Sequence, residues 1–512
     1  MPNTLPFAWD ITQRPNPWME NCDYPMRQVI IDGEVWIIHI TNSDVYKSQC
    51  QVARYKGPDL EHLERQPDGF AADMSGASAF ICGLWWDPAT RILYGLIHSE
   101  YGGWRNQGWC SKKTRLAVSH DIGLSWTLVG DILTRYLPEV NDYSGNFFEA
   151  GPADFDFYAD EKGGYFYVTS ITAFVPKYGR INGFVIHSEV ARCAIADKMA
   201  PGKWWKFRDG GWDEPGLGGR PSRLGFNQRG IYGNTIYSTY LQRYLRIGTH
   251  GGVEDGRGMP GFGYKDRSVY ISACTDLGKQ DWLPMAKLIS EPGNPLFGFT
   301  LTDSAGRDPV ACGQSLRVYN YWQNAGPGRV LDVTLKPGNS LSTYFPPYGN
   351  YEYEPHAESA DPLESRRTHI LGNRDSGVSF KGEWIFDANL YFYQGFALTA
   401  AQAGASIEFH FNGTGIYWRA AASPDGGKAD VFIDGELVET VDTWFGECLV
   451  PYQFAFVKTD LEPGEHTIKI VVRGDWNPNA SGTKIRHIAF EVSEHDVSFS
   501  RRTSGRCEER RC

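Results

Sequence analysis

The sequence predicts an all-β protein, a β-propeller of about seven blades followed by a jelly-roll β-sandwich. Three observations lead to this fold class. Short apolar strands joined by tight Gly, Asn or Asp turns recur from about residue 25 to 345, a tryptophan-containing corner motif follows one of them, and alternating strands return after a stretch rich in Pro and Glu. Helical periodicity of any length is missing, so no layer of helices is expected.

The corner motif has the pattern Ser-x-Asp-x-Gly-x-x-Trp and runs from Ser119 to Trp126, directly after a short apolar strand. We expect Asp121 to accept backbone N–H bonds across the turn, Gly123 to take a positive φ, and Trp126 to lie under the blade. The pattern resembles the Asp box of sialidase-type propellers. It marks a blade corner and not an active site.

Hairpins are predicted at residues 28–40, 80–98, 155–168 and 230–248, with a further strand at 315–322. A second, looser corner runs from Thr275 to Trp282, as expected if the corner recurs from blade to blade. Four strands and ~40–50 residues per blade give about seven blades, with six as the alternative.

The chain is therefore divided into four parts. Residues 1–345 are expected to form the propeller and catalytic domain, residues 346–372 a linker, residues 373–495 the sandwich and residues 496–512 a disordered, basic tail. The strands of the last domain alternate and include an Asp-Gly turn, and their order resembles the sandwich modules appended to carbohydrate-active enzymes. Such a module either binds glycan or braces the catalytic domain.

Composition and net charge limit the kinds of partner that the protein is expected to have. No apolar run of about 18 residues occurs, so a membrane span is not expected. The 50 Lys+Arg and 61 Asp+Glu residues give a net charge of −11, which disfavours a nucleic acid as a partner of the whole surface. We expect a monomer.

The ten cysteines lack the CxxC or Cys/His spacing of a zinc site, so no metal centre is expected, although a structural calcium ion stays open. Cys82, Cys193 and Cys274 lie in apolar runs, which favours buried thiols. The first residues do not read as a signal peptide, which was either removed or never present. Sequons at Asn412 and Asn479 suit a secreted, extracellular protein.

Four features carry a resemblance to a known family: Cys-Gly-Leu-Trp-Trp-Asp at 82–87, the strand ending in His-Ser-Glu-Tyr at 98–101, the corner at 119–126 and the trailing sandwich. Together they resemble the fungal L-rhamnose-α-1,4-D-glucuronate lyases, secreted enzymes that remove the rhamnose cap from arabinogalactan such as gum arabic. The related ulvan lyases share the seven-bladed architecture. The resemblance implies an exo-acting polysaccharide lyase that leaves an unsaturated glucuronate and needs no cofactor for catalysis.

Elimination at a uronate needs a base for the C5 proton, an acid for the leaving oxygen and a cation for the carboxylate. The resemblance implies a catalytic histidine at the end of an early strand, which His98 matches, and a tyrosine from the next inner loop, for which Tyr143 is the nearest candidate. Arg220 or Arg223, in a Gly-rich loop, is the expected carboxylate clamp, with Arg105 and Arg180 as alternatives. The upstream second histidine of these lyases is missing here, which leaves His98 alone as base and acid or weakens its assignment.

Other polar residues near predicted strand ends are expected to contact the sugar: Arg105, Asp154, Arg223, Tyr232, Asn234 and His250. Each has a structural alternative. A loop arginine is usually solvated, an aspartate at a strand start could cap a turn, and Asn234 or His250 could make a structural hydrogen bond.

A propeller exo-glycoside hydrolase of the sialidase, arabinanase or rhamnosidase type is the alternative function. Glu100, Glu149, Asp154 and Asp156 supply the carboxylates that hydrolysis needs, but a convincing arginine triad of the sialidase kind is not found. A lectin-like propeller with a Trp-rich rim is a third hypothesis. An unsaturated product that absorbs in the ultraviolet would separate the lyase from the other two.

Overall fold

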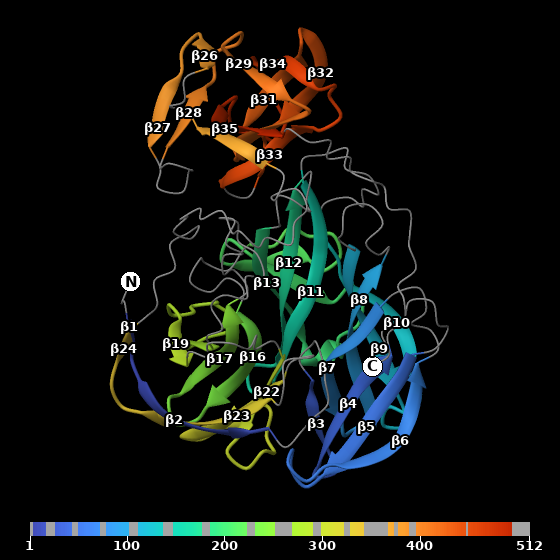
Figure 1. Ribbon diagram of the computed structural model, residues 1–512. Coiled ribbons are helices and arrows are strands. Elements are labelled where there is room, and N and C mark those ends of the chain that lie inside the picture. Colours follow the sequence, from blue (N-terminus) through green and yellow to red (C-terminus); the bar gives the residue numbers. More distant parts are fainter. Residues whose placement is uncertain are drawn as a thin grey trace.

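The computed structural model describes residues 4–16, 26–42, 50–71, 78–101, 111–136, 147–176, 185–222, 231–250, 269–289, 298–321, 328–341, 367–372, 377–388, 396–446 and 449–493 (Figure 1). These residues form β-strands and one short 3-10 helix, η2 (Ile195–Asp197). No helix within these ranges has the length and apolar character needed to cross a membrane. The predicted all-β class is confirmed.

Five sheets of four or five strands make up the first domain. The first three sheets contain β3 (Gln28–Ile31), β4 (Glu34–Asn42), β5 (Cys50–Gly57) and β6 (Glu64–Ala71); β7 (Ser78–Asp87), β8 (Ile92–Tyr101), β9 (Ser111–Ser119) and β10 (Thr127–Leu133); and β11 (Phe147–Asp160), β12 (Tyr165–Pro176), β13 (Val185–Ala194), β14 (Trp204–Arg208) and β15 (Gly211–Pro215).

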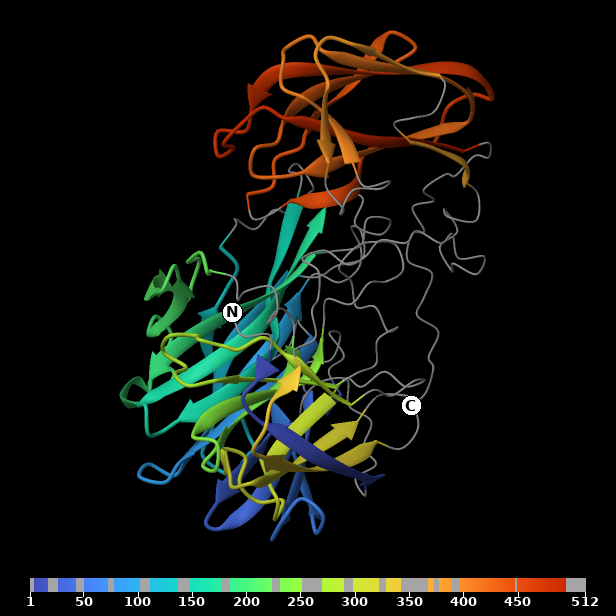
Figure 2. The same cartoon turned by 90° about the vertical axis from the view of Figure 1, so that its left-hand side faces the viewer.

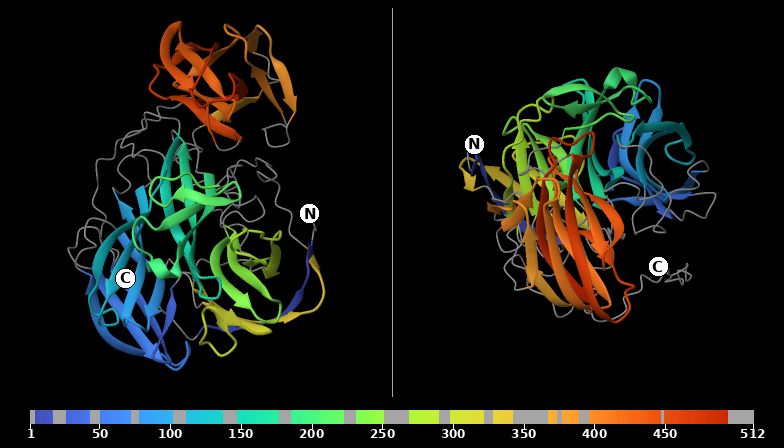
Figure 3. Two further views of the ribbon diagram at one scale, coloured as in Figure 1. Left: turned by 180° about the vertical axis from the view of Figure 1, so that it is seen from behind. Right: turned by 90° about the horizontal axis from the view of Figure 1, so that it is seen from above.

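The fourth and fifth sheets contain β16 (Ile231–Ser238), β17 (Arg243–His250), β18 (Val269–Cys274), β19 (Ala286–Ile289) and the two-residue β21 (Ala311–Cys312); and β20 (Gly298–Asp303), β22 (Ser315–Tyr321), β23 (Arg329–Lys336) and β2 (Ala8–Pro15). A separate pair joins β1 (Thr4–Leu5) to β24 (Ser340–Leu341). The N-terminal strand β2 is thus the outermost strand of the last sheet, and the dark-blue strand lies beside the yellow ones in Figure 3.

The sheets follow one another around a common axis in the order of the chain, and each contacts the next through its first strand: β3, β7, β11, β16 and β20. These five are the inner strands. We call the end of the propeller at which they begin the leading end. The fifth sheet meets the first again, since the Thr300 hydroxyl donates to the Met26 carbonyl at 2.6 Å and Gln28 Nε2 to Thr302 Oγ1 at 3.2 Å. The described part of the domain is a closed five-sheet propeller.

Among the described residues the propeller has five blades, which corrects the expected number of about seven. The estimate assumed ~40–50 residues per blade, whereas the second sheet runs from Ser78 to Leu133 and the third from Phe147 to Pro215. Inner strands of 10 and 14 residues account for part of this length. Longer strands use more of the chain per sheet, so fewer sheets are formed.

The predicted corner at residues 119–126 is confirmed. Asp121 Oδ1 accepts the N–H of Ser125 at 2.8 Å, Gly123 has φ +83°, and Trp126 is buried under β8, where an added Cβ on Gly95 would lie 2.6 Å from its ring. In the second corner the carboxylate of Asp281, one residue before the tryptophan, accepts the backbone N–H of Thr275 at 3.0 Å. Both corners hold a turn between two strands of one sheet.

The second domain is a sandwich of two facing sheets (Figure 2). One sheet contains β25 (Arg367–Gly372), β27 (Ile385–Ala388), β28 (Phe396–Ala400), β30 (Gly415–Ala422), β33 (Val450–Lys458) and β35 (Ile485–Ser493). The other contains β26 (Val378–Lys381), β29 (Ser406–Gly413), β31 (Gly427–Ile433), β32 (Glu436–Asp442) and β34 (Gly464–Trp476).

Alternating residues of both sheets form a core of their own, which includes Ile407, Trp418, Phe456, Ile468 and Phe490. Strand β25 pairs with β35, so the sandwich begins before residue 373, within the stretch predicted as a linker. That stretch shows no alternation in the sequence, and only its pairing partner makes it a strand.

Candidate functional site

An arginine lies at the centre of the ring of inner strands. Arg27 directly precedes β3, and its Nε donates to the Cys82 carbonyl at 2.8 Å while Nη2 donates to the Phe155 carbonyl at 3.0 Å. Its Nη1 lies 3.3 Å from Asp156 Oδ1, and both side chains are less than a tenth exposed. One side chain of the first sheet therefore joins the inner strands of the second and third.

Further hydrogen bonds join the other inner strands at the same height along the propeller axis. The Thr235 hydroxyl donates to Asp156 Oδ2, Asn234 Nδ2 donates to a carbonyl of β20 at 2.8 Å, and Thr300 donates to the carbonyl of Met26. These bonds link β11 to β16, β16 to β20 and β20 to the residues just before β3, while Arg27 bridges β7 and β11. We call Arg27, Asp156, Thr235, Asn234 and Thr300 the polar ring, and it closes the axis below the leading end.

The polar ring gives two predicted residues a definite place. Asn234, expected as a sugar contact, is 4% exposed and makes the structural hydrogen bond that was its alternative. Asp156, considered as a carboxylate for hydrolysis, is 5% exposed and holds Arg27 and Thr235. Burying an ion pair is costly unless further hydrogen bonds satisfy both groups, and the carbonyls around Arg27 supply these.

His98, the expected catalytic base, lies inside the second sheet. It is 1% exposed, its Nε2 lies 3.3 Å from Glu100 Oε1, and its ring contacts Phe80. Lys112 of the neighbouring strand lies 2.9 Å from the same carboxylate. Burial raises the pKa of Glu100, but the hydrogen bond from His98 and the charge of Lys112 outweigh it and hold the pKa well below its usual value. His98 is therefore one end of a His98–Glu100–Lys112 chain, in which His98 and Lys112 are buried and Glu100 is 25% exposed.

Arg220, the expected carboxylate clamp, follows β15, the outermost strand of the third sheet. Its backbone N–H donates to Glu214 Oε2 at 2.9 Å, and its guanidinium lies 5.4 Å from the ring centre of Tyr136. These contacts hold Arg220 beside outer strands and not among the inner strands that surround the axis.

The other predicted residues are only partly placed. Tyr143, Arg105 and Arg223 lie outside the described residues. Three more lie in strands whose backbone is described while their side chains are not: Asp154, Tyr232 and His250. The register of β16 and β17 sets Tyr232 opposite Thr249 and His250 opposite Ile231, so these two candidates are close neighbours at the leading end.

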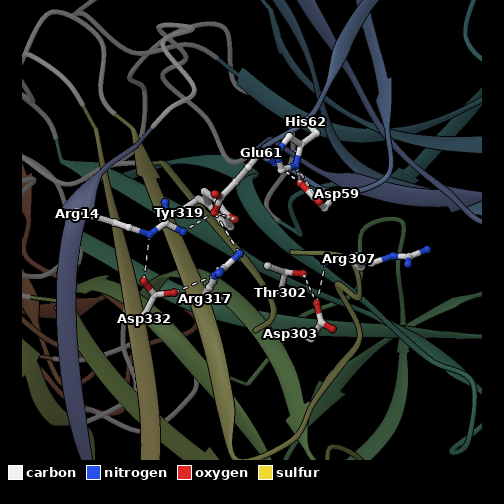
Figure 4. Close-up of polar contacts among 10 residues, drawn as sticks. All are labelled: Arg14, Asp59, Glu61, His62, Thr302, Asp303, Arg307, Arg317, Tyr319 and Asp332. Atoms are coloured by element: carbon white, nitrogen blue, oxygen red, sulfur yellow. Dashed lines mark hydrogen bonds and ion pairs between the residues drawn. The ribbon is translucent and has the colours of Figure 1, made fainter. Parts of the chain in front are cut away.

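A second cluster of charges closes the propeller at the outer strands (Figure 4). Glu61, in the turn between β5 and β6, accepts hydrogen bonds from Arg14 of β2, from Arg317 Nη1 at 3.1 Å and from the Tyr319 hydroxyl at 3.0 Å. Arg14 and Arg317 also bind the two oxygens of Asp332 at 3.1 and 2.8 Å. We call these five residues the closing cluster, and they join the first sheet to the last.

Sequence reasoning missed Arg27 and the closing cluster. Arg27 stands beside the apolar strand 28–31, and a charge directly before an inner strand is the signal that could have found it. Nothing local marks Glu61, because its partners are 47, 256 and 258 positions away.

Among the described residues, no group of three or more His, Cys, Asp or Glu side chains is arranged to hold a metal ion. Cys82, Cys193 and Cys274 are buried as expected, and burial raises the pKa of the Cys193 thiol to about 12. The structural calcium ion stays a prediction.

No family model matches the chain. Two curated proteins of Flavonifractor plautii match short segments: an A type blood α-D-galactosamine galactosaminidase is 38% identical over 126 residues, which is 25% of this chain and 10% of that protein, and an A type blood N-acetyl-α-D-galactosamine deacetylase is 36% identical over 111 residues, 22% of this chain and 14% of that protein. The chain thus spans about a tenth of the length of these relatives.

Solved structures are similar at a lower level. An exo-β-1,3-galactanase from Phanerochaete chrysosporium has a TM-score of 0.36 and 10% sequence identity, with 94% of this chain and all of that chain covered. Because this TM-score is low, the fold assignment rests on the strand pairing described above.

Proposed function

We propose that this protein is a carbohydrate-active enzyme, a propeller glycoside hydrolase with an appended sandwich module, acting on glycans that carry sugars of the galactose series. The sequence relatives support the substrate class, because both are named for galactosamine or N-acetylgalactosamine of the A type blood group. They carry different activities, so the segment that they share with this chain is not what defines either reaction.

The length of that shared segment fits the sandwich. The matches cover 126 and 111 residues, and the sandwich runs from Arg367 to Ser493, whereas the propeller is more than twice as long. We assign the match to the sandwich, as a module that brings different enzymes to similar glycans. Of the two possible roles for such a module, glycan binding and bracing of the catalytic domain, we propose glycan binding.

The observation that favours hydrolysis over elimination is the position of His98. A base that removes the C5 proton of a uronate must reach the substrate, and the His98 imidazole is 1% exposed and engaged with Glu100. Arg220 is held beside outer strands, so neither of the two residues expected to act as base and clamp lies on the propeller axis in a position to meet a substrate.

Glycoside hydrolysis requires a pair of carboxyl groups that flank the scissile bond, and we propose that the leading end supplies them. Glu149 is the third residue of β11, the inner strand of the third sheet, and is followed by two register irregularities in its pairing with β12. Bulges of this kind often stand beside active sites, where they redirect a side chain. Gly151 fits tightly here, since an added Cβ would lie 2.3 Å from the Lys112 carbonyl oxygen. We propose Glu149 as the first catalytic carboxylate and Asp154 as a sugar contact.

The test is to incubate the full chain with glycans ending in galactose, galactosamine or N-acetylgalactosamine, and with gum arabic, while following released sugar and ultraviolet absorbance together. We expect sugar release without a chromophore, reduced by a factor of about 10² to 10⁴ in Glu149→Gln, the range for loss of a general acid or base. Release of rhamnose with rising absorbance, abolished in His98→Ala, would instead establish the rhamnose-glucuronate lyase.

Location is part of the same proposal. Polymeric glycans of this kind lie outside cells, so we propose that the protein works there as a secreted monomer. Detection of the protein in the culture fluid of its source, and a single species of monomer mass on a sizing column with light scattering, would support this; a dimer or a retained protein would oppose it.

A further inference from the structure

A small cavity lies on the propeller axis, beside the polar ring. It has a volume of about 50 Å³ and is lined by residues of all five sheets, among them Gln28, Leu84, Phe157, Asn234 and Thr300. One water needs roughly 10–15 Å³ of such space. The cavity therefore holds water-sized occupants and excludes a sugar.

Two residues of the lining carry a buried side-chain oxygen that accepts no hydrogen bond from the described part of the chain: Gln28 Oε1 and Asn234 Oδ1. Their amide orientations are fixed from the other side, because Gln28 Nε2 donates to Thr302 Oγ1 at 3.2 Å and to the Arg307 carbonyl at 3.0 Å, and Asn234 Nδ2 donates to a β20 carbonyl at 2.8 Å. Both residues are 4% exposed. A buried acceptor without a donor is unfavourable, so each oxygen calls for a donor from the cavity.

The charges around the cavity decide what kind of donor fits. Arg27 lines it, and the guanidinium lies 3.3 Å from the buried Asp156. The described lining contains this cation and no carboxylate, which disfavours a metal cation in the cavity. A neutral molecule that donates two hydrogen bonds satisfies both oxygens without adding charge.

We propose that this cavity binds an ordered water molecule that donates to Gln28 Oε1 and Asn234 Oδ1. Buried waters of this kind bind otherwise unpaired polar groups and form part of the structure. The water joins the first and fourth sheets, which are not neighbours, and so adds a link across the axis that no side-chain contact of the polar ring provides.

A crystal structure of the full chain tests the proposal directly. We expect one density peak within hydrogen-bond distance of both oxygens, and no anomalous signal there after a rubidium soak. An empty cavity, or an anomalous peak that shows a cation, would overturn the proposal. Because no activity is measured, its failure is distinct from failure of the proposed hydrolase.

Two variants separate the role of the oxygen from that of the amide nitrogen. Gln28→Met removes Oε1, and we expect the water to be lost from the crystal structure and one long-lived internal water to disappear from the ¹⁷O relaxation dispersion in solution. Thr302→Val removes a partner of Gln28 Nε2, together with the hydrogen bond from Thr302 to the Asp308 carbonyl, but leaves Gln28 Oε1 in place, so the water should stay. Loss in both variants, or in neither, would contradict the assigned contact. Should Gln28→Met fail to fold, the crystal structure of the unaltered chain still decides.

Discussion

Glu100 is the central residue of the His98–Glu100–Lys112 chain of side chains in the second sheet. Its carboxylate meets the imidazole of His98 and the ammonium group of Lys112, and both of these side chains are less than a tenth exposed. Removing the charge of Glu100 leaves the buried ammonium group of Lys112 without an opposite charge. This costs more free energy than the net gain from forming the pair. The stability of the second sheet should therefore depend on this carboxylate.

We expect Glu100→Gln to lower the free energy of unfolding by about 1.5–3 kcal/mol at neutral pH, the range for hydrogen bonds to charged groups. The folded-state pKa of Glu100 is depressed, so its contribution is present above the unfolded value of about 4.3 and is lost as the pH falls through the folded value. The difference between the variant and the unaltered protein should shrink below about pH 4. Urea unfolding at several pH values measures it.

Lys113→Met is the control for this prediction. Lys113 pairs at 3.2 Å with Asp131, and both side chains are about a third exposed. Pairs of this kind contribute about 0.2–1 kcal/mol. Two results would contradict the role assigned to Glu100: a loss of unfolding free energy in Lys113→Met as large as that in Glu100→Gln, or a Glu100→Gln effect that does not change with pH.

Gly95 lies against the Trp126 ring of the first corner, where there is no room for a side chain. A Cβ at this position would lie 2.6 Å from the Trp126 ring. We expect Gly95→Ala to cost about 1–3 kcal/mol through overpacking, with a lower midpoint of thermal unfolding. Gly313→Ala is the matched control, since an added Cβ there meets nothing within 4 Å. Equal midpoints for the two variants would show that the corner tolerates the extra carbon.

At the scale of elements, strand β2 and the closing cluster decide whether the five sheets form a ring. Strand β2 comes from the start of the chain and completes the last sheet, and Glu61 ties that sheet to the first. Burial raises the pKa of Glu61, but hydrogen bonds from Arg14 and Tyr319 lower it below the usual value, so the carboxylate is charged when it binds both arginines.

We expect Glu61→Gln to lower the free energy of unfolding by about 1–3 kcal/mol, since the amide loses the charge that two arginines share. Added salt should reduce the gap from the unaltered protein, because the cluster is partly exposed. The exposed His62, which pairs with Asp59 one turn away, is the control, and His62→Ala should change stability by less than about 1 kcal/mol. A salt-independent loss, or equal losses in both variants, would speak against the charge contribution.

At the scale of the whole molecule, the propeller and the sandwich each have a hydrophobic core. The propeller is closed by Arg27 at its axis, whereas the sandwich is centred on Trp418, which is fully buried and donates to His487 Nδ1 at 3.1 Å. Separate cores predict separate unfolding.

We therefore expect two transitions in calorimetry of the full chain. Trp418→Ala should shift one of them by removing about 3–5 kcal/mol of packing. Arg27→Met should shift the other, because it removes the positive charge beside the buried Asp156, also at a cost of about 3–5 kcal/mol. A single transition that both substitutions lower equally would show that the two domains unfold as one unit.

The features that local sequence predicts correctly are those whose partners are close along the chain. The corner at 119–126 closes within eight residues, the hairpin strands of the propeller pair with neighbours, and the alternation in 428–441 marks one face of the sandwich. Turn chemistry and side-chain periodicity act over a few residues, so they can be recognised in the sequence without knowledge of the fold.

The number of blades, the polar ring and the closing cluster were decided only by tertiary structure. Arg27 reaches a carbonyl 128 positions away, and Glu61 meets Tyr319 across 258 positions. The same applies to His98, whose place at the end of an apolar strand suggested a catalytic base, while the packing of the sheets buried it against Glu100. A side chain's chemistry is visible in the sequence, but its exposure depends on which distant strands pack over it, and that is a property of the closed ring.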